Sequence, residues 1–178
     1  MLTDALSNGG LEIPHIEGPK AEELLDKLYP GSSVANPIDF LATGTAEQLG
    51  HVIDYCENHF DNIDAMIVIF GSPGLFKVFD VYRILDEKMK TCKKPIYPVL
   101  PSLQETQEEI NFFQNKGHQS FPDEVLLANA LVNYYHTPKP QPKEIQLPEI
   151  DTEKIRSIVD NCEVGYITPD KIQALLDA

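Results

Sequence analysis

The most constraining feature of this sequence is a continuous apolar run, Asp64–Phe70 (DAMIVIF), which lies between two segments with helical periodicity. A short, β-branched run without polar alternation is typical of a strand that is buried on both faces of a parallel sheet. Parallel strands need crossover connections, which the neighbouring amphipathic segments can supply. The sequence therefore predicts an α/β fold in three layers, with helices on both faces of a mostly parallel sheet.

The remaining elements follow from shorter signals along the chain. The prolines of Pro95–Leu100 (PIYPVL) favour a strand near the edge of the sheet or at its end, whereas Asp64–Phe70 is expected in the interior of the sheet. Thr45 is a plausible N-cap for the helix that follows it. Strands are predicted at Leu11–Ile16, Asp64–Phe70, Pro95–Leu100 and near Phe121, and helices at 1–8, 19–29, 45–60, from the turn at 71–74 to about 92, at 104–116 and at 123–135.

The composition changes after the last of these helices. Residues 137–148 (TPKPQPKEIQLP) contain four prolines, which can continue neither a helix nor a central strand. Two short helices are predicted beyond them, at 151–161 and 168–176, and a pair of this size does not bury a core alone. We therefore expect a body at 1–136, an extended linker at 137–150 and a helical tail at 151–178.

Charge and cysteine content exclude several classes of partner. The formal net charge of −14 disfavours nucleic acids and anionic membranes, because both need a cationic surface. No apolar run reaches 18 residues, and the first residues lack the features of a signal peptide. The three cysteines are odd in number and scattered, which favours free thiols in a reducing compartment. A cytoplasmic location is expected.

Three loops follow predicted strands or open predicted helices, where open α/β sheets bind their ligands. Helix N-termini there can hold a carboxylate or phosphate, although the same glycines and prolines also build ordinary turns. Asn36 and Asp39 leave the same two alternatives open, a structural turn or an orienting role toward a partner, and the structural role is favoured. The candidate residues are Asn36, Asp39 and Thr45 in the first loop, Ser72, Pro73 and Gly74 in the second, and Ser102 in the third.

No catalytic residue emerges from the motifs. The five histidines share no metal-ligand spacing, and none lies in a glycine-rich pocket that would suit a phosphohistidine. Neither the phosphate loop GxxxxGK[ST] nor the dinucleotide motif GxGxxG is present. A Gly-x-Ser-x-Gly elbow is also missing, which argues against a serine hydrolase. We expect no metal site and no catalytic side chain within this chain.

Taken together, three segments resemble a known family. The stretch GLEIPHIEGPKAEELLDKLYPGSSVANPIDFLATGTAEQL, then DAMIVIFGSPGL and KPIYPVLPS, is similar to part of the ADP-forming acyl-CoA synthetases and acetate–CoA ligases. The order of loops also resembles the carboxyl-terminal domain of the β-subunit of succinyl-CoA synthetase. This resemblance covers about residues 1–136, and the tail resembles the helical preface of the family's ATP-grasp module.

The resemblance implies a flavodoxin-like domain of an acid–CoA ligase. Such an enzyme interconverts acyl-CoA, ADP and phosphate with carboxylic acid, CoA and ATP through a phosphohistidine. Ser72, Pro73 and Gly74 occupy the place of a family loop that contacts the organic acid. CoA, ATP or ADP, and Mg would bind elsewhere in the parent enzyme, so no cofactor is expected here. The family's first strand precedes the part matched by Met1–Leu6, so we expect it to be missing and the isolated chain to be inactive.

Two further interpretations stay open. The domain could be a non-catalytic module that only dimerises or docks other domains, or, less plausibly, a stand-alone flavodoxin-like protein that binds a nucleotide or flavin. The expected partners are the remaining domains or subunits of the synthetase and a carboxylic acid or acyl phosphate. Because an unpaired strand edge recruits partners, self-association is also expected, by strand pairing or by exchange of the tail after the linker.

Overall fold

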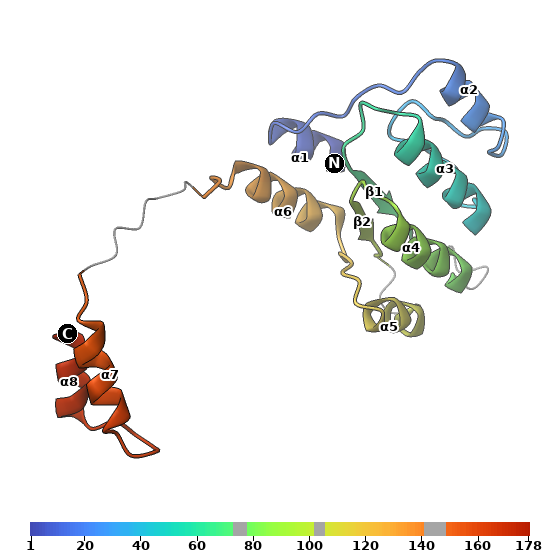
Figure 1. Ribbon diagram of the computed structural model, residues 1–178. Helices are drawn as coiled ribbons and strands as arrows, with labels where there is room; N and C mark the ends of the chain where they lie inside the picture. The colour runs from blue at the N-terminus through green and yellow to red at the C-terminus, as the bar shows by residue number, and fades with distance from the viewer. Residues whose placement is uncertain (73–77, 102–105, 141–148) are drawn as a thin grey trace. The chain divides into compact units, whose positions relative to one another are not determined.

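The computed structural model describes residues 1–72, 78–101, 106–140 and 149–178, and these form two compact units, Met1–Thr137 and Pro138–Ala178 (Figure 1). The first unit contains two parallel strands and six helices among its described residues, and the second contains two helices. The elements are α1 (Leu2–Asn8), α2 (Pro19–Leu25), α3 (Ala46–Asn58), β1 (Met66–Ile69), α4 (Phe79–Thr91), β2 (Ile96–Val99), α5 (Gln107–Asn115), α6 (Glu124–His136), α7 (Thr152–Asp160) and α8 (Pro169–Leu176).

The two buried apolar runs pair as predicted. β1 and β2 are parallel, with Met66 opposite Ile96 and Ile69 opposite Val99. The ladder extends beyond the strands, because the Phe70 amide donates to the Val99 carbonyl at 3.0 Å. Phe121 adds a parallel bridge beside Val99, which confirms the short extended segment predicted there.

Helices lie on both faces of this sheet (Figure 1). On one face, α3 and α4 bury a cluster that includes Leu49, Leu85 and the β1 residue Val68. On the other face, α6 packs against β2 and α1 packs against α6. Val99, Leu6 and Leu127 are buried on this second side, outside the main cluster. The chain thus has an α/β, flavodoxin-like fold with a short helical tail.

The predicted strand at Leu11–Ile16 is wrong, because this segment forms no ladder. Two carbonyls of this segment accept hydrogen bonds from side-chain amides instead. Asn36 Nδ2 donates to the Pro14 carbonyl at 2.9 Å, and Asn62 Nδ2 donates to the His15 carbonyl at 3.3 Å. Pro14 also lacks the N–H that a ladder would need. As a result β1 lies at the edge of the sheet among the described residues, and the interior position expected for Asp64–Phe70 is wrong too.

Polar contacts fix the helices of the first unit to one another. The Tyr55 hydroxyl of α3 donates to Glu23 of α2 at 2.6 Å, and this bond is the main reason why the pKa of Tyr55 is raised to about 12. Lys88 of α4 contacts both carboxylate oxygens of Asp54 of α3, at 2.6 and 2.7 Å. These contacts hold α2, α3 and α4 as one layer.

The second unit is an antiparallel helical pair. The Asp151 amide donates to the Ala178 carbonyl at 2.6 Å, which joins the start of α7 to the end of α8. Neither helix has a fully buried residue. In the part of the chain that the structure describes, no helix is long and apolar enough to cross a bilayer. The division into domains at 1–136, 137–150 and 151–178 stays a prediction.

Candidate functional site

The candidate site is the edge of the sheet at which the parallel strands end. β1 leads into Gly71 and Ser72, both half-buried, and β2 leads through Leu100 to Pro101. Because the strands are parallel, these segments leave the sheet at the same edge. The predicted site residues Pro73, Gly74 and Ser102 lie outside the described residues. Ser72 is thus the described member of the predicted acid-contacting loop.

The first predicted loop is brought to the same edge by an aromatic contact. The rings of Phe40 and Phe70 stack with centroids 6.4 Å apart, and Phe70 directly follows β1. Gly44 lies against the Phe40 ring so closely that a Cβ there would be 2.1 Å from Phe40 Cδ2. The absence of a side chain at Gly44 therefore lets Phe40 fill the space between this loop and the end of β1.

Asn36 and Asp39 bond to their own surroundings in this loop. The Asn36 amide holds the Pro14 carbonyl, as described above. The Asp39 backbone exchanges two hydrogen bonds of 2.8 Å with Ser33, and its carboxylate accepts from the Leu41 amide at 2.9 Å. These contacts are those of the structural alternative, and a role for either side chain toward a ligand stays a prediction.

Thr45 caps the N-terminus of α3. Its hydroxyl accepts from the Gln48 amide at 3.2 Å, and the Gln48 side chain accepts from the Thr45 amide at 3.1 Å. This reciprocal pair is a capping box, which occupies two of the N–H groups that a ligand would need. Thr45 is therefore an N-cap as predicted, and α3 is a poor anion site.

The N-terminus of α4 differs in this respect. Its N-cap residue is Val78, which has no side-chain oxygen and cannot accept from the first turn. α4 has 13 residues and is the next element along the chain after β1. The first N–H groups of such a helix carry a partial positive charge that favours an anion. α5, which follows β2, also lacks a side-chain cap, but it has two acidic residues in its first turn and α4 has one. The N-terminus of α4 is therefore better suited to a phosphate or carboxylate.

A group of buried polar side chains in α4 and at the start of α5 is not predicted by the sequence. Tyr82 of α4 is fully buried, and Thr106 and Glu109 at the start of α5 are buried too. Burial is the main cause of the raised pKa of Tyr82; the nearby Thr106 side chain lowers this pKa and the Glu109 carboxylate raises it further. Tyr82 occupies a core position of an amphipathic helix, so helical periodicity alone assigns it to packing.

A half-buried histidine, His118, contacts a carboxylate of α4. His118 Nε2 is 2.7 Å from the Asp86 carboxylate of α4, and its ring stacks on Phe113 with centroids 4.7 Å apart. Lys90 contacts the same carboxylate oxygen at 2.5 Å. His118 precedes the bridge at Phe121, so it lies toward the amino-terminal end of that extended segment. Over the described residues, no group of three or more potential ligands is placed to hold a metal ion.

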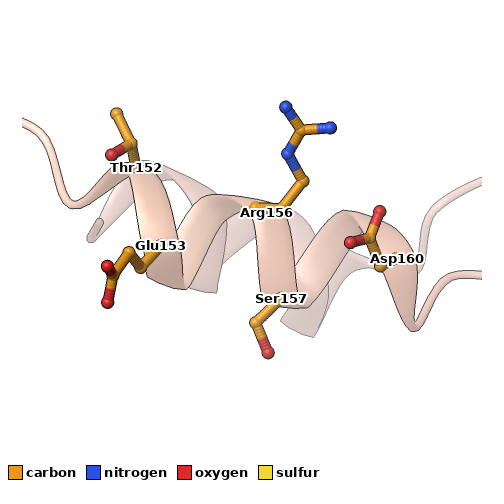
Figure 2. A pocket seen from close by; sticks show the side chains of 5 residues that line it. All are labelled: Thr152, Glu153, Arg156, Ser157 and Asp160. Atoms are coloured by element: carbon orange, nitrogen blue, oxygen red, sulfur yellow. The ribbon is translucent and has the colours of Figure 1, made fainter.

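A depression on the second unit is not part of this site. It is lined by Thr152, Glu153, Arg156, Ser157 and Asp160, all of which project from the single helix α7 (Figure 2). All five residues are exposed, and no second element supplies a wall among the lining residues. Arg156 is flanked by carboxylates rather than by further cations (Figure 2). We therefore treat the depression as helix surface.

Comparisons with known proteins show which solved structures have a similar fold. No protein-family model matches the sequence, and no curated protein matches it. Among solved structures, the chain is similar to PH0766 from Pyrococcus horikoshii OT3, with a TM-score of 0.62 and 23% identity over 74% of this chain and 32% of that one. It is also similar to the apo form of a dinucleotide-forming acetyl-coenzyme A synthetase 1 from Ca. Korarchaeum cryptofilum, with a TM-score of 0.59 and 19% identity over 75% of this chain and 31% of that one. The chain thus spans about a third of each neighbour and shares the fold of part of an acetyl-coenzyme A synthetase.

Proposed function

We propose that this chain is part of an ADP-forming acyl-CoA synthetase, in which it scaffolds the site of the acyl phosphate and the phosphohistidine. The observation that carries the proposal is the start of α4. A 13-residue helix without a side-chain cap follows β1 in the chain, in a fold that resembles part of an acetyl-coenzyme A synthetase. The helix dipole and the first-turn N–H groups, which no N-cap side chain accepts from, suit the negative charge of an acyl phosphate.

In this proposal the chain's own residues bind and orient rather than react. Ser72 and the loop after it line the binding site for the organic acid. The stacked rings of Phe40 and Phe70 hold the first loop beside the end of β1. The reacting histidine comes from another domain, because the histidines with described contacts face other groups. His118 pairs with Asp86 and His136 contacts the Gly9 carbonyl. CoA, ATP and Mg would supply thioester formation and phosphoryl transfer in the parent enzyme, outside this chain.

Titration with acetyl phosphate tests the proposed anion site. In ¹H–¹⁵N spectra of the full chain, we expect shifts of the Ser72 amide and of the amides at the start of α4. The capped starts of α3 and α6 serve as internal controls, because Thr45 and Asp123 already accept from their first turns. Equal shifts at all three helices would indicate unspecific salt effects and would contradict the proposal.

A charge variant sharpens the same experiment. Asp80 lies exposed in the first turn of α4, where its carboxylate repels an incoming anion. Asp80→Asn should strengthen acetyl phosphate binding about twofold to fivefold, the size of one charge at a helix end. Glu47→Gln is the matched control, because it removes the same charge from the first turn of the capped helix α3. An equal effect of both variants would mean that only overall charge matters.

A second function is favoured by a different observation. Asn36, Asp39 and Thr45, three of the predicted ligand-loop residues, are all bonded within the protein. This is what a non-catalytic interaction module of the same fold would show. Acetyl phosphate distinguishes the two, because an interaction module would give no localised shifts at α4.

A further inference from the structure

Helix α6 is more apolar than its burial requires. Nine of its 13 residues are Ala, Val, Leu or Tyr, yet only Leu127 and Ala128 are buried. A helix at the surface of a domain normally turns a polar face to water. α6 exposes Asn129 and Asn133, but Leu126 and Tyr134 also remain 56% and 79% exposed. The inner face of α6 is occupied by β2 and α1, so these two side chains belong to its outer face.

Three of the exposed residues form an apolar stripe. Leu126, Ala130 and Tyr134 are all exposed and follow one another at intervals of four, so they lie along one side of the helix. We call these three residues the α6 stripe. Its outer members are large and its middle member is small.

The α6 stripe is complementary to a second copy of itself. If two α6 helices pack antiparallel about a two-fold axis at Ala130, Leu126 of each copy lies opposite Tyr134 of the other. The two alanines at the centre then let the helices approach closely. A two-fold interface requires this kind of self-complementary pattern, in which the same two positions meet twice.

The charge distribution favours the same partner. Residues 1–137 hold 20 acidic and 9 basic residues, so two copies repel each other over most of their surface. α6 carries a single carboxylate, Glu124, in its first turn, and the α6 stripe has none. The stripe is thus a place where two copies can meet without bringing like charges together.

We propose that the α6 stripe is a homodimer interface of this chain. A 13-residue helix is about 20 Å long, so a single helix pair buries well below the roughly 800 Å² per partner of a standard interface. The dimer is therefore weak and dissociates on dilution. This surface is distinct from the start of α4, so the proposal stands or falls independently of the proposed function.

Sedimentation velocity of the full chain tests the interface. The mass should rise from about 20 toward about 40 kDa as the concentration increases from about 1 to 500 µM. Leu126→Glu and Tyr134→Glu each place a charge on the α6 stripe and should weaken dimerisation at least tenfold. The matched controls are Leu25→Glu and Tyr29→Glu, which make the same changes at exposed positions at the end of α2 and just beyond it, and should leave the mass curve unchanged. Far-UV circular dichroism checks that each variant is folded.

Other modes of association give different results. Exchange of the tail would be broken by Leu176→Glu, which alters an exposed residue of α8, and would be insensitive to Leu126→Glu. Pairing through the edge of β1 would survive all of these variants. Either pattern, or a constant mass near 20 kDa for the unaltered chain, would overturn the proposal.

Discussion

Replacing Gly44 by alanine tests whether Phe40 holds the first loop at the end of β1. An alanine Cβ would be 2.1 Å from Phe40 Cδ2, 2.5 Å from Cε2 and 2.7 Å from the Phe40 carbonyl oxygen. Ordinary contacts begin near 3.4 Å, so the ring must move by more than 1 Å. Ring rotation cannot relieve the contact with the carbonyl oxygen, because that atom belongs to the backbone. The loop itself must therefore shift.

The loss of unfolding free energy expected for Gly44→Ala lies at the upper end of the range for overpacking substitutions. Forcing extra carbon into a filled site costs about 1–3 kcal/mol, and the backbone contact places Gly44→Ala at about 2–3 kcal/mol. For a protein of this size, that lowers the melting temperature by about 5–10 °C. Urea unfolding followed by circular dichroism at 222 nm measures the change in the free energy of unfolding. The shifted loop should also weaken binding of acetyl phosphate at the start of α4.

Gly50→Ala is the matched control. A Cβ at Gly50, in the interior of α3, would meet Ile84 Cγ2 at 3.8 Å and Lys88 Cε at 4.0 Å, which are ordinary contacts. Alanine in a helix interior is more favourable than glycine by about 0.5–1 kcal/mol, so this variant should be stabilised. The two Gly→Ala changes are therefore predicted to have opposite signs.

A double-mutant cycle tests whether the Phe40 ring causes the destabilisation by Gly44→Ala. In a Phe40→Ala background the ring is gone and only the carbonyl contact remains, so Gly44→Ala should cost at least about 1 kcal/mol less than in the natural background. The reasoning would be refuted if Gly44→Ala were as mild as Gly50→Ala, or if its cost were the same with and without the Phe40 ring.

Three further predictions follow from the same structure. Contacts with Lys90 and then His118 hold the pKa of Asp86 below its ordinary value, so its stabilising effect is present above the unfolded pKa of about 3.9 and lost as the pH falls through the folded pKa. Asp86→Asn should thus cost about 1–2 kcal/mol at pH 7 and little near pH 2, as measured by urea unfolding, and a pH-independent cost would contradict this. Burial raises the pKa of Cys56 to about 11, so iodoacetamide at pH 8 should label Cys56 at least tenfold more slowly than Cys162 in native protein, as read by mass spectrometry; equal rates would contradict it. The isolated chain should form no acyl-CoA from acid, CoA and ATP in a coupled assay, and turnover above a buffer control would overturn that expectation.

The paired strands were predictable because their signal is local. β1 and β2 lie inside the predicted ranges Asp64–Phe70 and Pro95–Leu100, and both are short apolar runs. The predicted ranges end one residue beyond the strands, at Phe70 and Leu100, and both residues still make ladder bonds. A buried apolar run thus identifies a strand, whereas its exact end depends on neighbours that the run does not contain.

The failed strand at Leu11–Ile16 has the opposite cause. Its carbonyls are bonded by Asn36 and Asn62, which are 22 and 47 residues away from the groups they hold. An alternating apolar pattern shows which side chains face the core, and Ile16 is indeed buried. It does not show what satisfies the backbone. Long-range side-chain amides replaced the ladder, and no local pattern reports them.

The same distinction between local and long-range bonding decides how much of the candidate site can be read from a sequence. The Thr45–Gln48 cap was accessible, because Thr-x-x-Gln is a local signature, whereas the bond from Asn36 to Pro14 was not. Thr45, Asp123 and Asp151 cap α3, α6 and α7 with side-chain oxygens, but valine stands at the corresponding position of α4. A helix that begins at the ligand edge of a parallel sheet without a capping side chain leaves its N–H groups for another acceptor. The missing cap alone does not single out α4, because α1, α2, α5 and α8 also lack a side-chain cap; the combination of a missing cap, a place after β1 and a single first-turn carboxylate does.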